Sequence, residues 1–486
     1  MKTTKLFFMA ALALMTAACS NSDNDILTPA EQPANNMVTI TAKLAPKSGS
    51  AQTRALSDQT TYIKAEWAEN ETMKIISANG KEATATVNSV DGSGTATISF
   101  TIDAAAKGND CTIIYPASAA VTESAGVYTA QPMTAQTGTL SNDLDVRIGK
   151  GTITDEATPQ LEVTTLPAAQ FAIMKLTLAN DAKNLCIMAD NITIAGATLG
   201  TEGKEFTVAV PAVSSKTVTI VANDASNNCY YYSKANVSLD AGRYYQSSPT
   251  MTALDDDNSK TLYKITATSG ITIPDGKTVV LSGVNISSGS ITCSGNVTMI
   301  LLGSNSVTAT TNEKAAIKIG GSGTTLTITG SGSLTAHGGQ SAAGIGTDRN
   351  GTGGNIVING GTVTATGGKF GAGIGTGRAQ SGSSTCGDIT INGGTVTATG
   401  GSNGGAGIGT GLSITSGGSN TCGAITIGTG VTMVTATKGS GAPNSIGNGQ
   451  ADFGGTQTCG TITIGGDATT YAAGVTESPF TYPTAP

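Results

Sequence analysis

The 486-residue chain has few charged and few aromatic residues: 12% are Asp, Glu, Lys or Arg, and 4% are Phe, Trp or Tyr. Basic patches interleaved with aromatic residues are missing from the sequence, which argues against nucleic acid as a partner. The single histidine, His337, has no acid or nucleophile beside it in its repeat. The acids of the C-terminal half fall at unrelated positions, so they form no pair of the kind that glycosidases use. We therefore expect a protein that is not an enzyme and that needs no metal and no cofactor.

Long apolar runs are also missing, apart from Leu6–Met15 near the N-terminus. This run is too short to span a bilayer as a mature helix. It follows a short basic segment and leads into Thr-Ala-Ala-Cys ending at Cys19, which resembles a bacterial lipobox. We expect residues 1–18 to be a lipoprotein signal peptide, Cys19 to be lipidated, and residues 19–36 to form a tether. An ordinary secretory signal is the alternative. Two or three acyl chains hold a protein stably on a membrane, so the expected location is the cell outer membrane, exposed at the surface.

Glycine is abundant, with 65 residues, and many short segments alternate between apolar and polar residues with period two. Such segments, separated by turn clusters, predict an all-β protein. Their spacing in the first half of the chain favours two β-sandwich domains, which we place at residues 37–150 and 151–254. An acidic linker at residues 255–261 follows. Its three consecutive aspartates lack the spaced oxygen ligands of a calcium loop.

Residues 262–486 repeat one unit. The sequence from Ile356 reads Ile-Val-Ile-Asn-Gly-Gly-Thr-Val-Thr-Ala-Thr-Gly-Gly, and the sequence from Ile389 repeats it with a single change. Each copy continues into Gly-Ala-Gly-Ile-Gly-Thr-Gly. A repeat of this length and pattern predicts a right-handed parallel β-helix, in which neighbouring coils cover one another. The copies lengthen along the chain only in one loop, so the variable loops should lie along one edge of the rod.

Cysteines recur at the same place in successive copies. Cys386, Cys422 and Cys459 each open a Cys-Gly-X-Ile-Thr-Ile segment, and we expect them to stack as buried apolar thiols. Zinc would need four converging ligands, which these copies do not supply. In the second sandwich Cys186 and Cys229 could pair in an oxidising compartment, and the sequence leaves this open.

Sugar-binding sites commonly stack a sugar on an aromatic ring, and the repeat region offers few rings. Phe370 and Phe453 are its aromatic candidates, and the loop residues Arg349 and Arg378 are its polar candidates. We expect any ligand of the β-helix to contact these loops.

The N-terminal half resembles a known family in the order of its motifs. Thr53-Arg54-Ala55 follows the first strand, Trp67 precedes the segment Met73–Ile76, and the half closes with Leu239–Tyr245. This order resembles the fimbrillin (type V pilin) family of Bacteroidia over roughly residues 36–252. The resemblance implies two transthyretin-like sandwich domains and a lipidated precursor that a surface protease cuts after Arg54. It also implies donor-strand exchange with other pilus subunits.

The C-terminal repeats resemble β-helix modules of bacterial surface proteins, some of which bind carbohydrate. We therefore expect a cell-surface fimbrillin-like lipoprotein, an accessory or tip pilus subunit whose β-helix mediates adhesion to a glycan or to host matrix. After cleavage it would belong to the fimbrium. The alternative is a lipid-anchored polysaccharide-binding surface protein with a non-catalytic β-helix.

Overall fold

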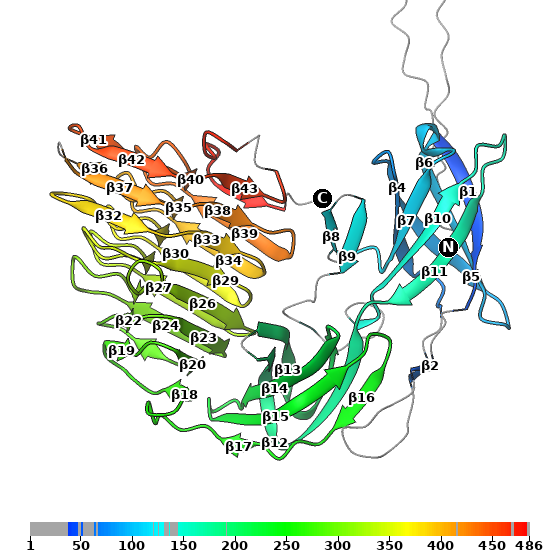
Figure 1. Cartoon of the computed structure of the whole chain (residues 1–486), viewed down its shortest axis with the longest axis horizontal. Helices are drawn as coiled ribbons and strands as arrows, with labels where there is room; N and C mark the ends of the chain where they lie inside the picture. The colour runs from blue at the N-terminus through cyan, green and yellow to red at the C-terminus, as the bar shows by residue number, and fades with distance from the viewer. Residues whose placement is uncertain are drawn as a thin grey trace, which may run out of the picture.

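The structure is a computed structural model. It describes residues 37–46, 50–51, 63–64, 67–119, 121–124, 126–130, 136, 144–190, 192–414, 417–467 and 471–483. Strands are the main element of these residues, and their one regular helix is the short 3-10 turn η1 (Ala104–Ala106). No helix in the described ranges is both long and apolar enough to cross a bilayer. The all-β class is therefore confirmed, and Figure 1 shows its two N-terminal sheets beside a β-helix.

The first unit is a seven-stranded antiparallel sheet with the order β1-β6-β5-β4-β7-β10-β11. Its inward side chains gather in a single apolar cluster that includes Ile40 from β1 and Leu161 from β11. One sheet thus curls around its own core, with β1 at one edge and β11 at the other, and the transthyretin-like form of this unit stays a prediction. The strands are β1 (Met37–Leu44), β4 (Thr72–Ser77), β5 (Glu82–Val90), β6 (Ala96–Asp103), β7 (Asp110–Tyr115), β10 (Arg147–Ile153) and β11 (Leu161–Ala169).

Two small pairs of strands accompany this sheet. The hairpin of β8 (Val121–Ser124) and β9 (Val127–Ala130) stands beside it, and β2 (Ser50–Ala51) pairs with β3 (Ile63–Lys64). The predicted division at residue 150 falls inside strand β10, because β10 and β11 complete the first sheet. The sequence gives no turn signal strong enough to mark the change of sheet, which comes between Ala169 and Ala172.

The second unit is a sheet with the order β13-β12-β14-β15-β17, and β16 pairs in parallel with β12. Its strands β12 and β13 are long and pair over most of their length. The cluster of buried side chains on one face includes Leu176, Ile187 and Phe206. The strands are β12 (Ala172–Ala189), β13 (Ile192–Val210), β14 (Val213–Asn223), β15 (Cys229–Leu239), β16 (Tyr244–Ser247) and β17 (Thr252–Ala253).

The third unit is a parallel β-helix, as the repeat predicts. Its core is one continuous cluster from Tyr263 to Phe480. Two long sheets carry most of its strands. The first consists of β18 (Leu262–Ile265), β20 (Lys277–Ser282), β23 (Val297–Leu302), β26 (Thr325–Gly330), β29 (Asn355–Ile358), β33 (Ile389–Ile391), β38 (Ile425–Ile427) and β43 (Ile462–Ile464). The second consists of β21 (Asn285–Ile286), β24 (Ser304–Thr308), β27 (Ser333–His337), β30 (Thr362–Thr366), β34 (Gly394–Thr399), β39 (Val431–Thr437) and the antiparallel end strand β44 (Phe480–Tyr482).

Shorter strands close each coil. One sheet consists of β19 (Ile271–Ile273), β22 (Ile291–Cys293), β25 (Ile317–Lys318), β28 (Ile345–Gly346), β31 (Ile374–Gly375), β35 (Ile408–Gly409) and β40 (Ile446–Gly447). In the longer coils the inserted loop adds β32 (Ser383–Cys386), β37 (Ser419–Cys422) and β42 (Thr456–Cys459), and β36 (Ser413–Ile414) pairs with β41 (Ala451–Asp452). The loop that lengthens from copy to copy, as the sequence predicts, therefore forms additional strands. These strands add a further face to the rod.

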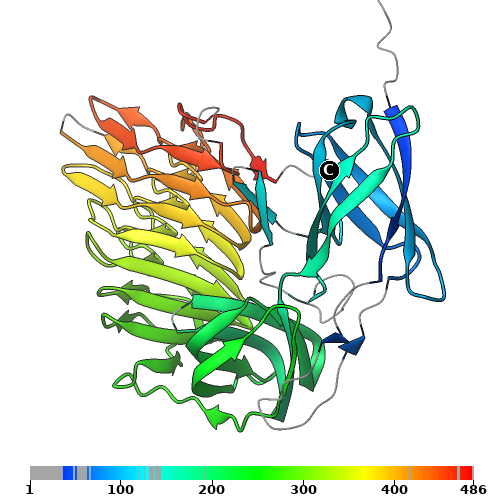
Figure 2. The same cartoon turned by 45° about the vertical axis from the view of Figure 1, so that its right-hand side comes forward.

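The second sheet packs against the first coils of the β-helix, as both views show (Figures 1 and 2). A separate apolar cluster joins them, here called the joint: Cys186, Met188, Val221, Cys229, Leu254, Val280, Ile300 and Leu302. Hydrogen bonds from Thr329 to Thr193 (2.8 Å) and from Ser331 to the carbonyl of Leu185 (3.3 Å) border it. The two units are thus packed together by buried side chains as well as linked by residues 255–261.

Candidate functional site

The loop edge of the β-helix is built on a row of glycines. Gly346, Gly375, Gly409 and Gly447 end the short strands β28, β31, β35 and β40, with φ between 122° and 144°. Glycine is the residue that adopts this backbone conformation readily, because it has no Cβ. The chain turns sharply there, and the following residues begin the variable loop.

Buried threonines then fix the start of each loop. The hydroxyl of Thr347 accepts a hydrogen bond from the amide of Gly377 (2.9 Å), and the hydroxyl of Thr376 accepts one from the amide of Gly411 (2.9 Å). Both threonines are almost fully buried. Each coil thus forms hydrogen bonds to the backbone of the next coil. Because Arg378 directly follows Gly377, its position is set by the preceding coil.

Arg378 lies over the ring of Phe370, with its guanidinium carbon 4.4 Å from the ring centroid, and the ammonium of Lys369 is 5.2 Å from the same centroid. Cations are attracted to the negative face of an aromatic ring at such distances. Within the described residues Arg378 forms no ion pair, and its buried Nε has no hydrogen-bond partner. Partial burial, and then the charge of Arg349, lower the pKa of its guanidinium.

Arg349 belongs to a neighbouring group of charges. It forms an ion pair with Glu313 (2.7 Å) and donates a hydrogen bond to Gln380 (3.2 Å). Beside it, the nearly buried carboxylate of Asp348 lies 3.0 Å from Lys314 and 3.3 Å from Lys318. Together these residues form the loop-edge cluster, in which basic residues outnumber acidic ones: Glu313, Lys314, Lys318, Asp348, Arg349, Lys369, Phe370, Arg378 and Gln380.

Phe453 stands apart from this cluster. It lies further along the same edge, after β41, and Ala451 of β41 stacks on Ser413, which in turn bridges Ala379. Its side chain is 85% exposed and its φ is 50°. The structure therefore brings Arg349, Phe370 and Arg378 together, and it leaves the exposed ring of Phe453 outside the cluster.

The cysteine ladder of the β-helix is confirmed. Cys386 pairs in register with Cys422, which pairs in register with Cys459. Hydrogen bonds with the neighbouring thiols Cys386 and Cys459, followed by burial, raise the pKa of the Cys422 thiol well above its ordinary value. Neutral buried thiols fit a packing role. Among the described residues no group of His, Cys, Asp or Glu is arranged to hold a metal ion.

Cys186 and Cys229 are free, buried thiols. They lie on β12 and β15, and β14 separates these two strands in the sheet. Both side chains belong to the joint instead of to a disulfide. The other predicted site residues of the N-terminal half, Cys19 and Arg54, lie outside the described residues.

Sequence reasoning missed a cleft of about 680 Å³ in the first unit. Side chains of β4, β7, β10 and β11 line it together with Glu123 and Tyr128 of the β8–β9 hairpin. No motif marks these residues, because they come from distant segments that only the curled sheet and its hairpin bring together.

Comparison with known proteins supports the C-terminal unit. A family model described as a beta helix repeat matches residues 326–349, 356–378 and 389–412. These segments include Arg349, Phe370 and Arg378. The search of curated proteins gives no match, and neither does the search of solved structures.

Proposed function

We propose that this chain is a cell-surface lipoprotein of the fimbrillin type, an accessory or tip pilus subunit whose β-helix makes adhesive contacts. The main observation in favour of this proposal is the position of strand β1. It lies at the edge of the first sheet, pairs with β6 from Met37 to Leu44, and contributes Ile40, Ala42 and Leu44 to the core.

Arg54 follows β1 in the sequence. A cut after Arg54 would release β1 together with the lipid at Cys19. The edge of β6 would then be open, and the core would be exposed beside Ile98, Phe100 and Ile102, which are all buried in the intact sheet. Such a groove accepts a strand from another pilus subunit by β-strand addition.

The loop-edge cluster supports the adhesive part of the proposal. It combines an aromatic ring, an arginine that has no ionic partner among the described residues, and several further cations along an edge that a rigid core positions. Binding residues commonly lie on loops of this kind.

The mature N-terminus tests the pilus proposal. Mass spectrometry of protein from the cell surface is expected to find a chain that begins at Ala55. The variant Arg54→Ala should instead keep acylated Cys19, whereas Lys43→Ala, on the exposed face of β1, should be processed normally. Acylated Cys19 on all of the wild-type protein would contradict assembly by donor strand.

That outcome would favour a second function, a lipid-anchored polysaccharide-binding protein with a non-catalytic β-helix. The observation in its favour is Arg378, a cation that lies on Phe370 without an ion pair among the described residues. Guanidinium groups bind carboxylate and sulfate groups well, so an acidic polysaccharide is the expected ligand.

Titration of the full chain with polygalacturonate, alginate and heparin tests this second function. Arg378→Gln is expected to weaken binding about tenfold, which corresponds to about 1.4 kcal/mol. Lys277→Gln is a matched control, because Lys277 binds carbonyls at the start of the β-helix, away from the cluster. Absence of binding to every acidic polymer would exclude this function.

A further inference from the structure

The cleft of the first unit lies on the face of the sheet that points away from the core. Thr112 and Lys150 line its floor, and the β8–β9 hairpin forms one wall. Its volume of about 680 Å³ falls within the range of small-molecule sites. The base of the hairpin is anchored, because Ala130 is buried in a cluster with Leu144 and Phe171.

The hairpin wall presents an aromatic ring beside a carboxylate. Tyr128 pairs with Glu123 across the hairpin, and both line the cleft. The amide of Gly126 donates a hydrogen bond to the Glu123 carboxylate, which holds this carboxylate in place. Burial, followed by the charges of Glu123 and Glu82, raises the pKa of the Tyr128 hydroxyl. This hydroxyl therefore remains a neutral hydrogen-bond donor.

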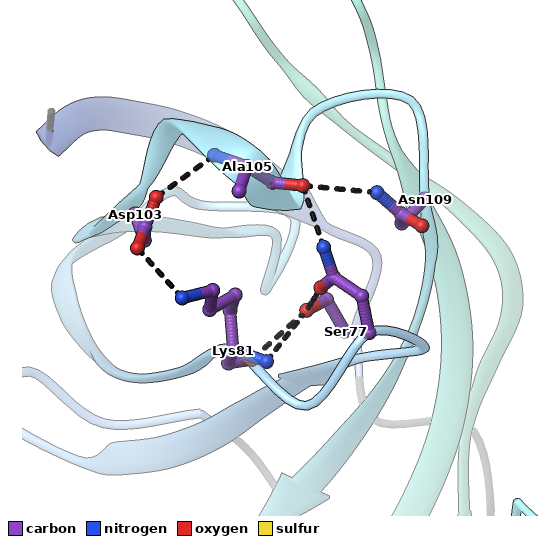
Figure 3. A network of polar contacts seen from close by, with 6 residues as sticks. Ser77, Lys81, Asp103, Ala105 and Asn109 are labelled. Atoms are coloured by element: carbon purple, nitrogen blue, oxygen red, sulfur yellow. Dashed lines mark hydrogen bonds and ion pairs between the residues drawn. The ribbon is translucent and has the colours of Figure 1, made fainter.

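The turn between β4 and β5 forms another part of the rim, and a polar network fixes it (Figure 3). Ser77 donates to Asn79 (2.5 Å) and accepts from the amide of Lys81 (3.0 Å). The Lys81 ammonium lies 2.8 Å from Asp103, and the amide of Asn79 donates to the carbonyl of Ala105 (2.7 Å). The rim is thus held before any ligand arrives, which reduces the entropy lost on binding.

The chemistry of the lining suits a polyhydroxylated ring. Asp110 and Glu123 are hydrogen-bond acceptors, Lys150 is a donor, and the hydroxyl of Thr164 can act as either. The ring of Tyr128 offers an apolar face with a polar tip. Two carboxylates against one ammonium leave the cleft negative, so uronic acids and sulfated sugars should be disfavoured.

We infer that this cleft binds a neutral sugar unit of a glycan, a hexose or N-acetylhexosamine, with Tyr128 as its platform and Asp110, Glu123 and Lys150 as its polar contacts. The inference is independent of the proposed function, because the cleft involves neither the loop edge of the β-helix nor strand β1.

Calorimetric titration of the full chain with cellotetraose, mannotetraose and chitotetraose tests the inference, with trigalacturonate as the acidic probe. At least one neutral probe should bind, and trigalacturonate should displace this probe at least tenfold more weakly than a neutral competitor does. Tyr128→Ala should weaken neutral binding at least tenfold, whereas Tyr128→Phe should change it less than threefold. Tyr230→Ala is the matched control, because Tyr230 lies on β15 of the second sheet.

Circular dichroism and thermal unfolding verify that each variant is folded. Glu123→Gln provides a second variant on the same wall and should also weaken binding. The inference is overturned if no neutral probe binds, if Tyr128→Ala binds as well as wild type, or if trigalacturonate displaces the neutral probe as well as a neutral competitor does. Arg378→Gln should leave this binding unchanged, which separates the cleft from the loop-edge cluster.

Discussion

The glycines of the tight corners have no room for a side chain. A Cβ atom on Gly375 would lie 1.9 Å from the carbonyl oxygen of Gly409 in the next coil, and φ at Gly375 is 132°. Both the contact and the backbone conformation are unfavourable for any other residue. The repeated Gly-Ile-Gly segment is therefore a requirement of close stacking.

Gly375→Ala is expected to destabilise the β-helix by about 3 kcal/mol, because it combines backbone strain with overpacking. The matched control is Gly321→Ala, since a Cβ at Gly321 would meet nothing within 4 Å. Urea unfolding followed by circular dichroism measures the difference. Equal midpoints for the two variants would refute the stacking argument.

The cysteine ladder predicts unequal thiol reactivity. Cys422 is buried with a raised pKa, so little thiolate forms at pH 8. Cys459 is partly exposed at the end of the ladder. Brief treatment of the folded protein with iodoacetamide should therefore modify Cys459 before Cys422, as read by peptide mass spectrometry. Labelling after denaturation is the control, and equal rates in the folded protein would contradict the buried ladder.

Sequence reasoning at this scale identified the loop residues but not their partners. Residue type and loop position alone mark Arg378 and Phe370 as candidates. Their contact depends on the path of the chain around the corner at Gly375, which the sequence pattern does not specify. Phe453 shares both features and lies outside the cluster, so residue type and loop position do not by themselves predict a cluster.

At the scale of elements, strand β44 closes the end of the β-helix. It pairs antiparallel with β39, and its Phe480 is buried against the last coil. The ring of Phe480 also packs edge-on against Tyr471 at 6.0 Å. Without β44, the edge of β39 and the apolar core beneath it would be open to other chains.

Removal of residues 478–486 is therefore expected to convert the protein into soluble oligomers or aggregates. Size-exclusion chromatography with light scattering measures the mass. Thr481→Ala, which keeps the strand, should behave as wild type does. A truncated chain that elutes at the wild-type mass would show that β44 does not protect this end.

Elements of the β-helix could be predicted closely, and those of the first half could not. The inward Ile and Val of each copy stack as the repeat predicts, for example Ile358 on Ile391. The N-terminal strands follow no repeat. Their order in the sheet depends on long-range pairing, such as β1 with β6, and alternation predicts strands without predicting partners.

At the scale of the whole molecule, the joint couples the second sheet to the β-helix. Ile300 of β23 faces the joint, whereas its neighbours Met299 and Leu301 face the core of the rod. Strand β23 is thus covered on both faces. The sequence indicates that this strand is buried on both faces, because Val297–Leu302 is nearly continuous in apolar residues, whereas the strands of later coils alternate with threonine.

Ile300→Asp would bury an unpaired carboxylate in the joint, at a cost of at least about 3 kcal/mol. We expect it to separate the unfolding of the second sheet from that of the β-helix, seen as an added transition in calorimetry. Thr390→Asp, on the outward face of β33, should leave the wild-type profile unchanged. A profile for Ile300→Asp that matches wild type would mean that the units are not coupled through this cluster.

The in-register stacking of coils also makes the reach of the rod adjustable. Asn392 donates a hydrogen bond to Asn359, its counterpart in the preceding coil (3.0 Å). Deletion of residues 359–391 would join Ile358 to Asn392 and restore the same Ile-Asn-Gly-Gly-Thr sequence. The rod would shorten by one strand spacing, about 4.8 Å, while its end coils and the joint kept their own contacts. The number of coils therefore sets how far the protein extends, and a change in this number does not alter the surface at either end.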